Sequence, residues 1–184
     1  MEEGWSQSLD RLAEEVARTA GESLFVISRA FKASRELLFR AWTEPEHMKN
    51  WWGPKGGVVL KAKMDFRPGG IYHYGMRLPD GTKSWGRFVY REIARPERLV
   101  WVNSFSDENG GITSHPMSPN WPRETLTTVT FTEQSGKTNV SIQWLPINAT
   151  EVEIKTFEEG RQGMLLGWGG SLDQLKEYLA GIRP

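Results

Sequence analysis

Six segments of β-forming residues follow one another between residues 56 and 147, and they are the feature that most limits the folds open to this chain. All but one of their connections are short and rich in turn-forming residues, such as Pro79-Asp80-Gly81. Connections this short join antiparallel strands, because parallel strands need a long crossover. The sequence therefore predicts an antiparallel meander. Its predicted strands are residues 56–66, 70–78, 83–93, 97–105, 123–133 and 137–147.

The connection over residues 106–122 differs from the others. Its sequence, SDENGGITSHPMSPNWP, is long, polar and rich in proline and glycine. A loop of this length inside a compact domain is typical of a functional or mobile segment.

A further strand and two short helices are predicted before the meander. Residues 23–31 are rich in β-formers, and a helix with Ser34 as its N-cap follows. A second helix is predicted to begin with a capping box formed by Thr43 and Glu46, and to end at the adjacent tryptophans Trp51 and Trp52. Two helices this short cannot bury a core alone, so we expect them to close over the sheet.

A long helix is predicted at the C-terminal end. Thr150 is its expected N-cap, with Glu153 completing a capping box, and the helical pattern continues for about 30 residues. Glycines interrupt this pattern at positions 160, 163, 167, 169 and 170. Each interior glycine weakens a helix by roughly 1 kcal/mol. We therefore expect either a bend or close packing of the helix backbone against the sheet.

Charge and composition argue against several classes of partner. The chain has 23 basic and 23 acidic residues, so no net field attracts nucleic acid or an anionic membrane, and we expect neither partner. It has no cysteine, which leaves out thiolate chemistry and Cys-based metal sites. The acidic first residues do not resemble an export signal, so a cytoplasmic protein is expected. The nine tryptophans point instead to a large aromatic interior.

The order of these elements, together with several motifs, resembles the family named for the activator of the heat-shock-protein-90 ATPase, in the START-like or SRPBCC superfamily. This resemblance covers about residues 23–181. It implies an α+β helix-grip fold, in which a curved antiparallel sheet wraps around a long C-terminal helix. Residues 23–184 would form this domain, and residues 1–22 a helical extension. The motifs are RAWTEPEHMKNWWGP (40–54), MDFRPGG (64–70), MRLPDG (76–81), EIARPERLVW (92–101), NSFSDENG (103–110) and GWGGSLDQLKEYLA (167–180).

The resemblance also implies a ligand cavity between the sheet and the final helix. The small helices plug one end of this cavity in such folds, which would place Trp51 and Trp52 at the plug. An empty pocket of about 300 Å³ would cost around 7 kcal/mol at roughly 24 cal/mol per Å³. A cavity must therefore be wet, partly polar or occupied, and we expect a small hydrophobic or aromatic ligand.

Strand alternation indicates which side chains face that cavity. Tyr72 and Tyr74 share one face of their strand, and Thr127 shares a face with Val129 and Phe131. For any single residue, ordinary core packing competes with cavity lining. The predicted cavity residues are Trp51, Trp52, Tyr72, Tyr74, Met76, Trp101, Asn103, Phe105, Val129, Phe131, Ile142, Trp144, Met164 and Trp168.

Two other functions remain open at this point. The first is a cyclase-like or hydrolase-like enzyme that uses Tyr, Arg or His side chains of the cavity, with Tyr72, Tyr74, Arg87 or Glu124 as candidates for proton transfer. No catalytic residue is assigned, however, and no cofactor is expected. The three histidines stand far apart in the sequence without acidic partners at ligand spacing, so no metal site is predicted either. The second alternative is a co-chaperone or interaction module, which would need an exposed apolar or charged patch.

An internal similarity links the two ends of the chain. Residues 4–16 align without gaps on residues 167–179 and share Gly, Trp, Ser, Leu, Asp, Leu and Glu. Amphipathic helices often reuse Leu and Glu, but a shared Gly-Trp pair is not a requirement of helical periodicity. We interpret the N-terminal segment as a remnant of a preceding tandem copy. Residues 1–20 would then pack on a neighbouring domain or on a second chain in a homodimer.

Overall fold

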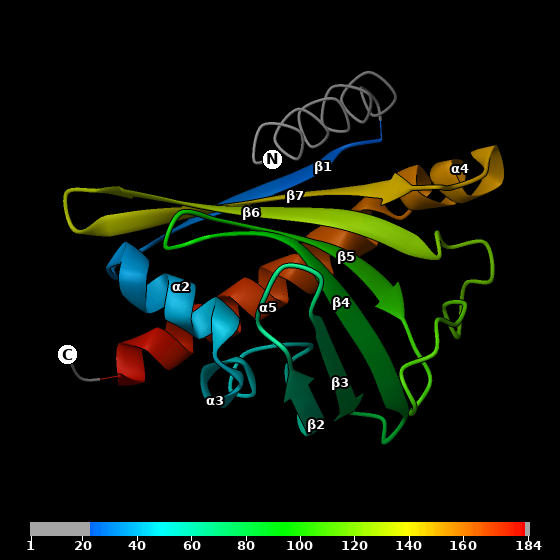
Figure 1. Ribbon diagram of the computed structural model, residues 1–184, viewed down its shortest axis with the longest axis horizontal. Helices are drawn as coiled ribbons and strands as arrows, with labels where there is room; N and C mark the ends of the chain where they lie inside the picture. The colour runs from blue at the N-terminus through cyan, green and yellow to red at the C-terminus, as the bar shows by residue number, and fades with distance from the viewer. Residues whose placement is uncertain (1–22, 183–184) are drawn as a thin grey trace.

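The computed structural model describes residues 23–182, and one seven-stranded antiparallel sheet dominates it (Figure 1). The strand order is β1-β7-β6-β5-β4-β3-β2, so strands β2 to β7 follow one another across the sheet as they do in the chain. This order confirms the predicted meander, and it places the first strand beside the last. The strands are β1 (Phe25–Phe31), β2 (Val58–Met64), β3 (Ile71–Arg77), β4 (Lys83–Ala94), β5 (Arg98–Phe105), β6 (Glu124–Gln134) and β7 (Lys137–Ile147).

Helices lie at one end of the sheet and along its concave face. Helices α2 (Arg35–Thr43) and α3 (Pro45–Met48) follow β1, and α4 (Glu151–Glu159) and α5 (Arg161–Gly181) follow β7. The curved sheet extends over α5, while α2 and α3 lie beside the C-terminal half of α5 (Figure 1). Leu172 and Leu175 of α5 belong to the same buried core as Trp101 and Val129 of the sheet. The predicted α+β helix-grip fold is therefore confirmed.

Two strand pairs of the sheet are irregular. The register shifts between Val59 and Lys61 in the β2–β3 pair, and between Tyr90 and Glu92 in the β4–β5 pair. A β-bulge bends its strand and increases the local twist. These two bulges lie in the half of the sheet that bends around α5.

The first helix begins as predicted, whereas the second does not. Ser34 caps α2 and accepts a hydrogen bond from the Leu37 N–H. Thr43 does not form the predicted capping box, because it is the last residue of α2 and its hydroxyl donates to the Phe39 carbonyl at 2.8 Å. Glu44 is the N-cap of α3, but its side chain makes no capping hydrogen bond to the helix. Helix α3 is short and ends at Met48. Trp51 and Trp52 follow in a turn.

The predicted long C-terminal helix is present as α5, but the helical region is divided at Gly160 into two helices instead of being continuous from residue 151. The capping box of Thr150 and Glu153 is present at the start of α4. A β-carbon at Gly160 would lie 2.9 Å from Cζ3 of Trp121, so this position needs glycine for close approach. The other four glycines have no atom within 4 Å of a β-carbon position, so close packing does not explain them.

Several expectations concern residues outside this description. The internal similarity involves residues 4–16, and the expected contact of residues 1–20 with another domain or chain lies outside the described residues. Within residues 23–182, no helix is both long and apolar enough to span a membrane.

Candidate ligand cavity

Trp42 occupies the centre of a large aromatic cluster. Helix α2 inserts this side chain beneath the sheet, where it is 1% exposed. Its ring lies 4.7 Å from that of Trp51, between ring centroids, and it stacks on Trp168 of α5 at 6.1 Å. Trp52 and Trp101 are its other tryptophan neighbours. The helical spacing of α2 indicates that Trp42 is buried. It does not indicate that Trp42 also contacts Trp51 and Trp52 of the turn after α3 and Trp168 of α5.

A cavity of about 160 Å³ lies beside this cluster. Each of its walls comes from a different element: the turn after α3, the strands β3 to β7, and helix α5. The side chains that line it are Trp52, Tyr74, Phe88, Trp101, Asn103, Thr127, Trp144 and Trp168.

Two small residues among large aromatic ones leave this space open. Thr127 of β6 lies opposite Trp101 of β5 on one side and opposite Trp144 of β7 on the other. The short threonine side chain between the two indoles leaves space between Trp101 and Trp144. Gly86 of β4 lies opposite Tyr74, and a β-carbon at position 86 would be only 2.4 Å from the Tyr74 hydroxyl oxygen. Glycine therefore lets the tyrosine lie across β4.

The lining is polar in places but carries no charge at neutral pH. The Trp52 indole N–H donates a hydrogen bond to the Tyr74 hydroxyl. Burial raises the pKa of Tyr74 to about 12, although this hydrogen bond opposes the shift. Two buried atoms of lining residues, Oδ1 of Asn103 and Nε1 of Trp144, have no hydrogen-bond partner within residues 23–182.

Polar groups of α5 hold the plug at the end of the cavity. The Gln174 side-chain amide donates to the Gly53 carbonyl at 2.6 Å, and the Ser171 hydroxyl donates to the same oxygen at 3.1 Å. The turn that carries Trp52 is thereby fixed to the helix on the opposite side of the cavity. Trp51, by contrast, donates its own N–H to the Ala41 carbonyl at 2.9 Å and is fully buried.

The structure brings together only part of the predicted set. Trp52, Tyr74, Trp101, Asn103, Trp144 and Trp168 line the cavity. The others lie elsewhere: Trp51, Tyr72, Val129, Phe131 and Ile142 pack in the main core, Met76 is buried next to Gly53, Phe105 makes an edge-to-face contact with His115, and Met164 packs with Phe25 and Phe157.

Sequence reasoning missed two lining residues, Phe88 and Thr127. Phe88 lies directly between Tyr72 and Asn103 in the sheet register, so the alternation of β4 is the signal that indicates it. Thr127 is on the predicted face of β6, but nothing in a lone threonine marks it as cavity lining.

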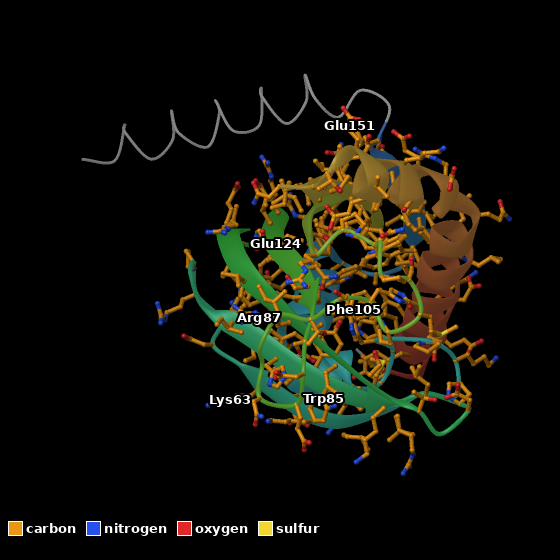
Figure 2. The ribbon with its side chains drawn as sticks, turned by 90° about the vertical axis from the view of Figure 1, so that its right-hand side faces the viewer. Lys63, Trp85, Arg87, Phe105, Glu124 and Glu151 are labelled. Carbon is orange, nitrogen blue, oxygen red and sulfur yellow. The ribbon has the colours of Figure 1, made fainter. Side chains whose placement is uncertain are left out.

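Of the residues considered for proton transfer, Tyr74 lines the cavity, whereas Arg87 and Glu124 lie outside it. Arg87 is paired in register with His73 on the other face of the sheet, and its guanidinium donates to the Gly110 carbonyl at 2.8 Å. Glu124 accepts a hydrogen bond from the Asn148 side chain. Figure 2 shows Arg87, Glu124 and Trp85 at the end of the molecule where the long β5–β6 loop passes. Within residues 23–182, no three metal-ligating side chains come together.

A curved antiparallel sheet that wraps a long helix, with two short helices at one end of an aromatic cavity, defines the helix-grip class of START-like domains. The family of Activator of Hsp90 ATPase homolog 1-like proteins matches residues 32–180. This match covers most of the chain, which therefore belongs to that family.

Solved structures of several bacterial proteins share the fold of this chain. Protein Ms6760 from Mycobacterium smegmatis has 21% sequence identity and a TM-score of 0.73, over 89% of this chain and 94% of that one. A protein from Arthrobacter aurescens has 24% identity and a TM-score of 0.74, over 89% of each chain. The AHSA1 protein from Silicibacter pomeroyi has 18% identity and a TM-score of 0.65, over 85% of this chain and 97% of that one. A comparison with curated proteins finds no match.

Proposed function

We propose that this domain binds one small hydrophobic or aromatic molecule in the cavity beside Trp42. The observation that carries the proposal is the cavity itself, about 160 Å³ of space lined largely by aromatic rings. Left dry and empty at roughly 24 cal/mol per Å³, it would lower the stability of the domain by about 4 kcal/mol. Because a domain is stable by only about 5–15 kcal/mol, a bound guest that fills this space would contribute substantially.

Binding is better supported than proton-transfer catalysis. A general acid or base works best when its pKa lies near the operating pH. Tyr74 is the one titratable side chain in the cavity lining, and burial raises its pKa to about 12, far from neutral. Arg87 and Glu124 lie on other surfaces. The geometry therefore supports a binding role, in which Tyr74 acts as a neutral hydrogen-bonding group.

Native mass spectrometry of the freshly purified protein tests the proposal directly. We expect a fraction of the molecules to carry a co-purified small molecule, or, if the purified protein is empty, an apolar compound that raises its melting temperature. The proposal is wrong if the protein is empty and no compound in a library of small aromatic and aliphatic molecules shifts the melting temperature.

A variant with a filled cavity separates cavity binding from surface binding. Thr127→Met places a longer apolar side chain between Trp101 and Trp144, and we expect it to abolish the melting shift. Thr128→Met is the matched control, because Thr128 is next in the strand and points to the opposite face of the sheet. Equal melting shifts for both variants would place the ligand outside the cavity.

A further inference from the structure

We infer that the ligand is an uncharged compound with a single aromatic ring and a small substituent that both donates and accepts hydrogen bonds, such as an aryl amide or an aryl alcohol. This inference rests on the proposed function, since it specifies what the same cavity selects. Three observations support it: the volume of the cavity, an unpaired polar atom in each of two of its lining residues, and the absence of charged side chains from its lining.

The volume limits the ligand to about one ring. An engineered apolar cavity of about 150 Å³ in another protein stays dry and binds benzene. The cavity here is about 160 Å³, so it accommodates one six-membered ring with little space to spare. The aromatic rings of Trp52, Phe88 and Trp168 supply partners for edge-to-face or offset contacts with an aromatic guest.

The unpaired polar atoms specify the substituent. Nε1 of Trp144 is a donor that needs an acceptor, and Oδ1 of Asn103 is an acceptor that needs a donor. A buried polar group left without a partner is costly, so a guest that pairs with both atoms is favoured over a purely apolar one. A primary amide or a hydroxyl group carries both functions in a few atoms.

The lack of charge excludes ionised ligands from the same space. A carboxylate needs a cation or several N–H donors to offset its desolvation. The lining contains no Lys, Arg or His, and the Arg87 guanidinium lies on the other face of the sheet, where it binds the Gly110 carbonyl. The Tyr74 hydroxyl is protonated at neutral pH and accepts the Trp52 N–H, so it compensates no full charge.

Three probes of nearly equal size test this selectivity at neutral pH: benzamide, toluene and benzoate, each titrated calorimetrically into the wild-type protein. We expect benzamide to bind tightest, toluene to bind about three- to tenfold more weakly because it makes no hydrogen bonds, and benzoate to bind at least about a hundredfold more weakly. Benzoate binding as tightly as benzamide would overturn the inference while leaving the proposed function intact. If only larger apolar compounds bind, the size limit is wrong. If no compound binds, the proposed function fails as well.

The Asn103→Leu variant tests whether this side chain provides the polar recognition. Leucine has nearly the same size but no polar atom, so we expect benzamide to lose about three- to tenfold in affinity while toluene binds as well as before. Retained toluene binding also reports that the variant is folded with its cavity intact. If Asn103→Leu itself fails to fold, Trp144→Phe provides the same comparison, because it removes only the indole N–H and part of the ring.

Asn139→Leu is the matched control. Asn139 is also an asparagine of the sheet, on β7, but its side chain is exposed, and we expect its replacement to change neither affinity. Unchanged benzamide binding in a folded Asn103→Leu or Trp144→Phe variant would show that the pocket polarity does not select the ligand.

Discussion

Trp121 lies so close to Gly160 that a β-carbon at position 160 would be 2.9 Å from Cζ3 of the indole. The contact joins the long β5–β6 loop to the junction between α4 and α5. The Trp121 ring also packs on Trp144 and Phe157, at centroid distances of 5.9 and 5.3 Å. Since Trp144 lines the cavity, the loop and the helix junction together support one of its walls.

This contact predicts opposite effects for two glycine substitutions. Gly160→Ala should lower the free energy of unfolding by about 1 kcal/mol, because the new methyl group meets the indole and the ring must move. Gly163→Ala is the control, with no atom within 4 Å of its β-carbon, and should raise it by about 0.5–1 kcal/mol through helix propensity. Urea unfolding of both variants measures the difference. An equal stabilisation by both would mean that the close contact does not constrain the fold.

The two adjacent tryptophans should respond differently to truncation. Trp51→Ala is expected to lower the free energy of unfolding by about 4 kcal/mol, because it empties a core site and leaves the Ala41 carbonyl without its donor. Trp52→Ala should cost about half as much, roughly 2 kcal/mol, because that side chain is only partly buried. Its main effect should be on ligand affinity. Denaturant unfolding combined with ligand titration of both variants tests this division, and a larger stability loss for Trp52→Ala would contradict it.

The alkaline stability of the protein should depend on Tyr74. Burial raises its pKa to about 12, whereas a tyrosine in the unfolded chain titrates near 10. The ionised form is disfavoured in the folded state, so the contribution of this group is complete below about pH 10 and is lost as the pH rises toward 12. Tyr74→Phe should therefore reduce the decline in stability between about pH 9 and about pH 11.

Some of that decline should remain in Tyr74→Phe, because burial also raises the pKa values of Tyr72 and Tyr90. Urea unfolding at both pH values provides the measurement, with Tyr178→Phe as the control outside the cavity. A decline identical to that of the wild type would show that Tyr74 is accessible to water in its ionised form.

The start of the long loop should loosen in acid. The backbone N–H groups of Gly111 and Asn109 donate to the Asp107 carboxylate and hold its pKa below the usual value. Because the pKa of Asp107 is lower in the folded state than in the unfolded chain, the ionised carboxylate stabilises the turn at any pH above its unfolded-state pKa, near 4. This stabilisation is lost as the pH falls through the folded-state pKa. Intrinsic amide exchange slows over this range, so the protection factor, which is the ratio of intrinsic to observed exchange rate, is the quantity to compare. We expect the protection factors of Asn109 and Gly111 to decrease as the pH falls from about 5 to about 3.

Asp107→Asn should remove this acid dependence, and Glu108→Gln should leave it unchanged. Glu108 is the neighbouring acid, and its carboxylate makes no bond to these amides. Protection that stays constant with pH in the wild-type protein would mean that the turn holds without the carboxylate charge.

Local pattern was sufficient to predict the strands but not all of the helix ends. The period of two and the turn residues placed the strands to within two residues, because both signals depend only on near neighbours. Thr43 shows the limit. Its sequence context fits a capping box, yet its hydroxyl donates to the Phe39 carbonyl, because α2 includes Thr43 as its last residue instead of ending before it. Both arrangements satisfy a local rule, and the packing of Trp42 under the sheet favours the longer helix.

The sequence by itself determined the family, the meander and the aromatic character of the interior, since motifs and alternation are properties of residues close together in the chain. Only the tertiary structure decided which aromatic side chains fill space and which surround it. A cavity is the volume that remains after side chains from many elements have packed, so it cannot be predicted from any single segment of the sequence. Trp51 and Trp52 are adjacent in the sequence but have different roles. Trp51 is buried in the core and donates to the Ala41 carbonyl, whereas Trp52 lines the cavity together with Thr127.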